Sequence, residues 1–122
     1  MYSEKVMKKF KHPKHIGVVK NADAVGELQN PVCMDAMKLT LKIDEKTGKI
    51  TDAKIQTFGC VAAVTTAMQL VDMIKGKTLK EALKISKDDV VKEVGGLPKE
   101  KIHCSVLAVD CLKKAAENYK KG

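Results

Sequence analysis

The residues best suited to chemistry are a thiol and an imidazole side by side, Cys104 and His103, where a glycine-containing loop leads into the last predicted helix. At a helix N-terminus, the free backbone N–H groups and the positive end of the dipole favour thiolate over thiol. Cys60 precedes another predicted helix, and Cys33 lies in a turn before a strand. Thiols in such places can bind metal or attack sulfur. The three together predict a metal or sulfur site.

Two further side chains could complete this site. Asp35 follows Cys33 by two residues, and His103 directly precedes Cys104. A carboxylate oxygen or an imidazole nitrogen can complete a tetrahedral site with thiolates, and either would be an exchangeable ligand for iron. We therefore predict Asp35 and His103 as candidate ligands.

The remaining cysteine and two other histidines fit other roles. Cys111 lies seven residues after Cys104 on the same predicted helix, which places it ~10 Å away and too far to share one metal ion. It is predicted to be a small core side chain. His12 and His15 occupy a polar N-terminal segment, where we expect them to be exposed.

A predicted β-hairpin brings two of the thiols together. Residues 38–44 alternate cleanly between apolar and polar side chains, which is typical of a half-buried strand. Residues 45–49, with Gly48 available for a positive φ angle, form the loop, and residues 50–58 return as the antiparallel partner. The outer ends of this hairpin lead to Cys33 and Cys60, so ordinary strand pairing makes the two thiols neighbours.

The other predicted elements are helices and one edge strand. Residues 61–75 are apolar nearly all round as far as Leu70, which indicates a buried helix that Gly76 ends. Two pairs, Thr78 with Glu81 and Ser86 with Asp89, have capping-box spacing and predict two short helices. A short helix is expected over residues 3–10, an edge strand over 24–29 and a long helix over 104–119.

Length and composition indicate one cytoplasmic domain over residues 1–122. With 44% hydrophobic but only 3% aromatic residues, the core must be built from aliphatic side chains. We find neither a secretory signal nor an apolar run long enough for a membrane span, and free thiols are expected rather than disulfides. The net charge of +8 comes from 23 lysines without arginine, spread along the chain and not interleaved with aromatic residues. This distribution argues against nucleic-acid binding.

Four segments resemble the IscU and NifU N-terminal family of iron–sulfur cluster assembly scaffolds. They are Asn30-Pro31-Val32-Cys33-Met34-Asp35, Thr57-Phe58-Gly59-Cys60, Gly76-Lys77-Thr78-Leu79 and Ile102-His103-Cys104-Ser105-Val106-Leu107-Ala108. They occur in the family's order, and the similarity runs from about residue 3 to residue 119. The resemblance implies an α+β fold in which several helices, including a long C-terminal one, pack against a three-stranded antiparallel sheet.

The resemblance also implies a function. In that family a cysteine desulfurase supplies persulfide sulfur, iron binds at the same site, and a [2Fe-2S] cluster is built and passed to apo-proteins. Carried over, Cys33, Cys60 and Cys104 are expected to be cluster ligands, with Cys104 the first persulfide acceptor. Asp35 or His103 would supply the fourth ligand, and zinc could occupy the same site. The protein would be a scaffold rather than an enzyme, working with an electron donor such as a ferredoxin, as a monomer or a homodimer.

Two positions depart from the family pattern. Met34 stands where the family usually has glycine, so the turn after Cys33 does not have glycine's freedom. Residues 97–101 read Leu-Pro-Lys-Glu-Lys in place of the usual Leu-Pro-Pro-Val-Lys. Because of this change, we do not expect a dedicated Hsp70 chaperone to dock here.

Two other functions compete with the scaffold. One is a zinc-dependent sulfur acceptor resembling SufU, but that group has an insertion between the second and third cysteines and lacks the histidine. Here the spacing from Cys60 to Cys104 is uninterrupted and His103 is present. The other is a structural zinc module in a binding protein, which would unfold when its metal is removed.

Overall fold

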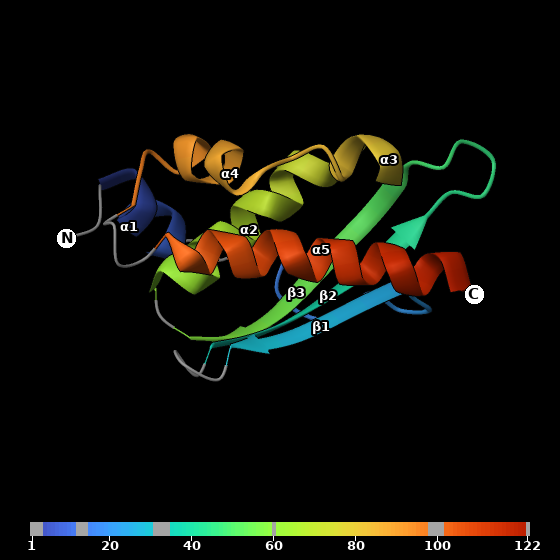
Figure 1. Cartoon of the computed structure of the whole chain (residues 1–122), viewed down its shortest axis with the longest axis horizontal. Coiled ribbons are helices and arrows are strands. Elements are labelled where there is room, and N and C mark those ends of the chain that lie inside the picture. The colour runs from blue at the N-terminus through green and yellow to red at the C-terminus, as the bar shows by residue number, and fades with distance from the viewer. Residues whose placement is uncertain (1–3, 12–14, 31–34, 60, 98–101, 122) are drawn as a thin grey trace.

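The protein folds as a sheet with helices on one face. The computed structural model describes residues 4–11, 15–30, 35–59, 61–97 and 102–121. Figure 1 shows the elements in chain order: α1 (Glu4–Lys11), β1 (Ala24–Asn30), β2 (Asp35–Ile43), β3 (Ile50–Phe58), α2 (Val61–Ile74), α3 (Leu79–Ala82), α4 (Lys87–Glu93) and α5 (His103–Lys121). The predicted α+β class, three-stranded sheet and long C-terminal helix are confirmed.

The sheet is antiparallel with the strand order β1-β2-β3. The predicted hairpin joins β2 to β3, and Gly48 has the expected positive φ angle of 74°. The strand predicted from residue 38 begins earlier, at Asp35. It is longer because its pairing with β1 continues as far as Asn30 opposite Asp35, and a pattern of alternating side chains within one strand does not reveal how far its neighbour extends.

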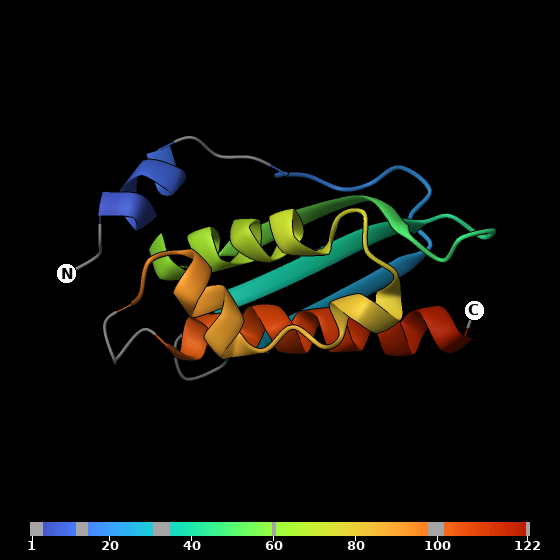
Figure 2. The same ribbon diagram turned by 90° about the horizontal axis from the view of Figure 1, so that it is seen from above.

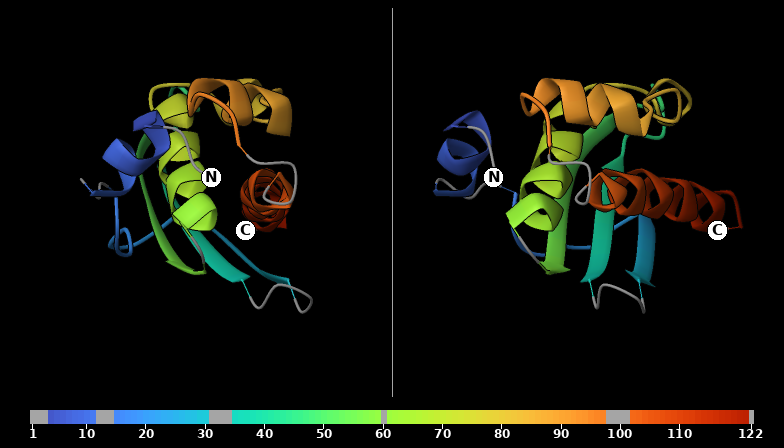
Figure 3. Two further views of the ribbon diagram at one scale, coloured as in Figure 1. Left: turned by 90° about the vertical axis from the view of Figure 1, so that its left-hand side faces the viewer. Right: turned by 60° about the vertical axis from the view of Figure 1, so that its left-hand side comes forward.

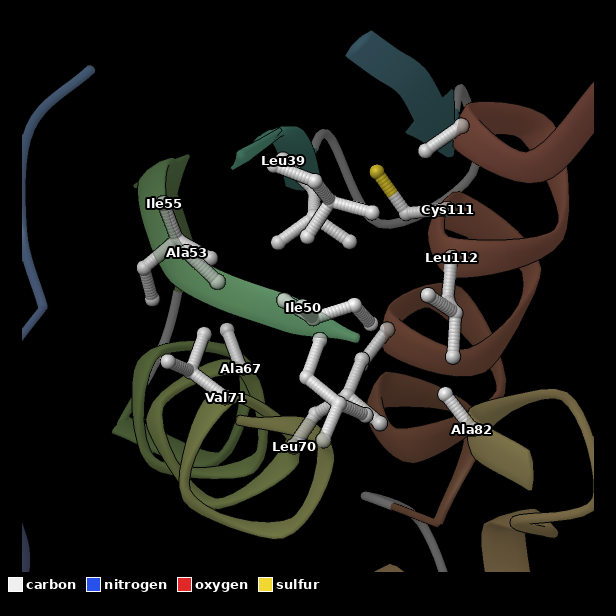
Figure 4. Close-up of a cluster of buried hydrophobic side chains, with 14 of the residues drawn as sticks. Leu39, Ile50, Ala53, Ile55, Ala67, Leu70, Val71, Ala82, Cys111 and Leu112 are labelled. Carbon is white, nitrogen blue, oxygen red and sulfur yellow. The ribbon is translucent and has the colours of Figure 1, made fainter. Parts of the chain in front are cut away.

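The core lies between the sheet and the helices. Leu39, Leu41 and Ile43 on β2 are buried as the alternation predicts, and α2 buries most of its surface. Figure 4 shows aliphatic side chains from the strands, α2 and α5 meeting in one cluster. Each fully buried Leu or Ile contributes about 1.5–3 kcal/mol relative to an exposed one, so this layer holds the helices on the sheet.

Both capping boxes form as predicted. The Thr78 hydroxyl accepts a hydrogen bond from the Glu81 N–H, and the Glu81 carboxylate accepts one from the Thr78 N–H. Ser86 and Asp89 do the same at the start of α4. The backbone N–H donated to each carboxylate stabilises its charged form, and the pKa values of Glu81 and Asp89 are lowered.

The N-terminal segment wraps around the sheet from its β3 edge. Helix α1 packs against α2 with Val6 fully buried, as Figure 2 shows from above. The chain then pairs with β3. Ile55 donates its N–H to the His15 carbonyl, and Gly17 donates its N–H to the Ile55 carbonyl. Farther on, the Val19 N–H donates to Thr40 Oγ1. Figure 3 shows that α2 and α5 lie on the face of the sheet opposite to this part of the N-terminal segment.

Among the described residues, no helix combines the length and apolar character that a membrane span requires.

Candidate functional site

The strand ends that flank Cys33 and Cys60 in sequence lie together at one end of the sheet. Asn30, the last residue of β1, lies opposite Asp35, the first residue of β2. On the other side of β2, Ala36 lies opposite Phe58, the last residue of β3. The Thr57 hydroxyl donates to the Ala36 carbonyl at 2.9 Å and ties these two strand ends together.

Helix α2 begins at this same end. Its far end returns to the start of β3, where Ile50 donates its N–H to the Lys77 carbonyl and Gly76 donates to the Ile50 carbonyl. The helix therefore runs antiparallel to β3, and its first residue, Val61, directly follows Cys60 in sequence. Leu97, which follows α4 in sequence, packs against Ala62 and Ala63 in the first turn of α2.

Helix α5 begins at this end too. Asn118 near its C-terminus donates to the Val25 carbonyl at the start of β1, and Cys111 in its middle contacts Gly26 and Met37. The helix thus runs antiparallel to β1, with its first turn at the end of β1 and the beginning of β2. Figure 1 shows α2 and α5 both starting on the left, beside the same ends of the strands.

Side-chain hydroxyls make hydrogen bonds within the first turns of both helices. Ser105 is fully buried, and its hydroxyl donates to the Ile102 carbonyl at 2.6 Å. In α2 the buried Thr65 and Thr66 hydroxyls donate to carbonyls of the first turn, Thr65 to Val61 at 2.8 Å and Thr66 to Ala62 at 2.6 Å. These buried hydroxyls are therefore satisfied by carbonyls one turn earlier in the chain.

The structure places the backbone of three predicted site residues. Asp35 opens β2, and His103 and Cys104 are the first two residues of α5. Cys33, Met34 and Cys60 lie outside the described residues, as do residues 98–101 of the segment that departs from the chaperone-docking pattern. Among the side chains that are described, no three His, Cys, Asp or Glu residues gather into a metal site.

The prediction for Cys111 is confirmed. Its side chain is fully buried, and burial raises the pKa of its thiol to about 12. At neutral pH the group is therefore a neutral S–H donor, and its sulfur lies 3.2 Å from the Gly26 carbonyl and 3.5 Å from that of Met37.

His15, predicted to be exposed rather than ligating, is less exposed than expected. Its ring lies 2.7 Å from an Asp72 carboxylate oxygen of α2, and its side chain is only 18% exposed. The residue also has a positive φ angle of 63°. The polar residues around His15 in sequence gave no indication of its contact with Asp72, which is 57 positions away. His12 lies outside the described residues.

Phe58 is a feature that sequence reasoning missed. This aromatic side chain is 75% exposed at the site end of β3, on the outer face of the sheet. It lines a shallow depression with residues from all three strands. The sequence could have revealed it, because the alternation along β3 that buries Ala53 and Ile55 turns Phe58 outward.

The comparison with protein families decides the assignment. The model of the NifU-like N-terminal domain matches residues 1–122. The chain belongs to this family. The family assignment made from the four sequence segments is thereby confirmed.

Relatives of this NifU-like chain carry names that agree with one another. It is 49% identical over 119 residues to the iron–sulfur cluster assembly scaffold protein IscU 1 of Archaeoglobus fulgidus, covering 98% of this chain and 76% of that protein. It is 45% identical to the nitrogen fixation protein NifU of Azotobacter chroococcum, covering 98% of this chain and 38% of the relative.

A solved structure shares the NifU-like fold. It is a protein from Fervidobacterium islandicum, described as a scaffold for iron–sulfur cluster assembly in the SUF system. The two structures superimpose with a TM-score of 0.79 at 26% identity, covering 93% of this chain and 95% of the other.

Proposed function

We propose that this protein is a scaffold on which sulfur and iron are combined into a labile [2Fe-2S] cluster that is then passed to apo-proteins. The observation that supports the proposal is the meeting of the starts of β2, α2 and α5 at one end of the sheet. The sequence places Cys33, Cys60 and Cys104 at or next to these three starts. Two of these are helix N-termini, which favour thiolate.

In this proposal Cys104 accepts sulfur first. Its thiolate attacks the terminal sulfur of a persulfide on a cysteine desulfurase, so that a new S–S bond forms on Cys104 and the donor cysteine leaves as thiolate. Two electrons from an external donor such as a ferredoxin then reduce this sulfur to sulfide. The protein gains and loses its cargo without being changed, as a scaffold does.

Cys33, Cys60 and Cys104 then hold the cluster, with Asp35 or His103 as the fourth ligand. A carboxylate holds an iron–sulfur centre less firmly than a thiolate, and imidazole is likewise exchangeable. Such a mixed ligand set suits a site that must release its product.

Anaerobic reconstitution tests this function. The protein is incubated with ferrous iron, cysteine, a cysteine desulfurase and a thiol reductant as electron donor, and the visible absorption of a [2Fe-2S] cluster is followed. We expect the chromophore in the wild type and its loss in Cys104→Ser. A wild-type protein that stays colourless while retaining zinc would overturn the proposal.

A second candidate function is a zinc-dependent sulfur acceptor resembling SufU, and the neighbour from Fervidobacterium islandicum is described as a SUF-system protein. Such an acceptor would take sulfur onto a thiol while zinc stays bound, and would form no chromophore in the same experiment. A structural zinc module would lose its circular dichroism on chelation, whereas we expect the scaffold to stay folded, because its core is formed by residues outside the site.

A further inference from the structure

Helix α5 lies directly on the backbone of β1 at one residue, Gly26. A Cβ atom added to this glycine would lie 2.2 Å from the Cys111 carbonyl oxygen and 2.6 Å from the Ala115 nitrogen. Both are backbone atoms of α5, so no side chain can move aside. Real Cβ atoms essentially never approach other atoms closer than 3.0 Å. Glycine is therefore required here to let the helix approach this closely.

Cys111 fixes the helix at the same place. Its buried sulfur lies between the carbonyl oxygens of Gly26 on β1 and Met37 on β2, and Figure 4 shows it on the side of α5 that faces the strands. Because burial keeps the thiol protonated, it can donate to these carbonyls. Gly26 thus sets how close α5 comes to the sheet, and Cys111 sets its position along the strands.

Short rigid elements connect this contact to the proposed site. Cys111 lies seven residues after Cys104, which is ~10 Å along α5. On β2, Met37 is two residues from Asp35, ~7 Å along the strand. A displacement of α5 at Gly26 is therefore passed on to the first turn of the helix, while the start of β2 stays in place.

We propose that Gly26 and Cys111 are positioning residues for the thiol site, holding the α5 backbone at Cys104 in place relative to the start of β2. The inference rests on the proposed function, since it concerns the ligands named there. Metal sites need their ligands held to within about 0.5 Å, and relieving the 2.2 Å contact to at least 3.0 Å exceeds that tolerance.

Cobalt(II) is the probe for this proposal. Thiolate-bound cobalt has charge-transfer bands that report sulfur ligation and visible d–d bands that report geometry. In Gly26→Ala we expect cobalt to bind roughly tenfold more weakly, with shifted d–d bands. The matched control is Gly76→Ala, which places alanine at a φ of 87° with nothing within 4 Å of the new Cβ, at the opposite end of α2.

The control separates positioning from a general loss of stability. Gly76→Ala strains a turn without touching α5, so it should lower the melting temperature yet leave the cobalt spectrum unchanged. If Gly26→Ala folds and binds cobalt with the affinity and bands of Gly76→Ala, the positioning role is wrong.

A second pair of variants keeps the test decisive if Gly26→Ala does not fold. Cys111→Ala removes the donor to both carbonyls, whereas Cys111→Ser keeps an O–H donor in its place. We expect weaker cobalt binding and shifted bands in the alanine variant and recovery in the serine variant. Equal spectra and affinities in the two variants would overturn the proposal.

The cobalt spectrum of the wild type tests the proposed function separately from the positioning role. A wild-type protein without thiolate–cobalt charge transfer would defeat the proposed function and this proposal with it. A wild-type protein that shows these bands, with variants that bind identically, would defeat the positioning role alone.

Discussion

Burial of the Cys111 thiol makes the free energy of unfolding depend on pH. In the unfolded chain this group loses its proton near its ordinary pKa of 9.0, whereas burial raises the pKa to about 12 in the folded protein. Below pH 9 both states are protonated and its stabilising contribution is fully present. Between pH 9 and 12 the unfolded chain releases a proton that the folded chain keeps, so rising pH favours unfolding.

We therefore predict that the free energy of unfolding of the wild type falls more steeply over this pH range than that of Cys111→Ala, by up to about 1.4 kcal/mol per pH unit. Denaturant unfolding at several pH values measures the difference. Every other ionisable group is present in both proteins, so its contribution cancels in the comparison. Parallel pH profiles would contradict the raised pKa.

Asp35 gives a prediction about cluster lifetime. Replacing Asp35 with alanine removes the carboxylate and leaves the imidazole of His103, which suits iron better, as the candidate for the fourth position, so the reconstituted cluster should persist longer. The decay of its visible absorbance under added chelator measures this. Asp52, an exposed carboxylate on β3 whose ion pair is with Lys75, provides the control variant Asp52→Ala. A faster decay in Asp35→Ala would count against the assignment.

At the scale of elements, local chemistry sets where the helices begin. The capping boxes at Thr78 and Ser86 were predicted from spacing alone and occur as expected, because both partners of each box lie within four residues. The start of β2 was predicted less well, because it depends on pairing with β1, a contact between distant segments. Local hydrogen bonding can be read from sequence, whereas the extent of strand pairing cannot.

The cap of α4 offers a test at this scale. Ser86→Ala removes the hydroxyl that accepts from the Asp89 N–H and should lower the free energy of unfolding by about 1 kcal/mol. Ser86→Thr keeps an acceptor and should lose much less. Urea unfolding of the three proteins measures both effects, and equal losses in the two variants would mean that the cap contributes little.

At the scale of the whole molecule, the hydrophobic pattern determined the layers but not their closest contacts. Alternation in β2 and the apolar character of α2 correctly predicted which faces are buried. The close approach at Gly26 and the His15–Asp72 pair depend on how helices and strands meet in space. The site shows the same division, since the hairpin predicted that two segments are neighbours, whereas the placement of α5 required the packed structure.

The two faces of the sheet should respond differently to substitution. Leu39→Ala leaves a cavity in the core and should cost about 2–5 kcal/mol. Phe58→Ser, at a side chain that is 75% exposed, should change the free energy of unfolding by no more than about 0.5 kcal/mol. Thermal unfolding compares them, and a large loss in Phe58→Ser would show that the aromatic ring supports the fold.

The pairing of residues 15–17 with Ile55 has a consequence for how the protein behaves in a crowded solution. A bare strand edge presents free N–H and C=O groups to which a strand from another molecule can add, and this is a common first step of aggregation. Here His15 and Gly17 occupy the backbone groups of Ile55 on β3. By occupying these groups, the N-terminal segment opposes the addition of a strand from another molecule at this edge.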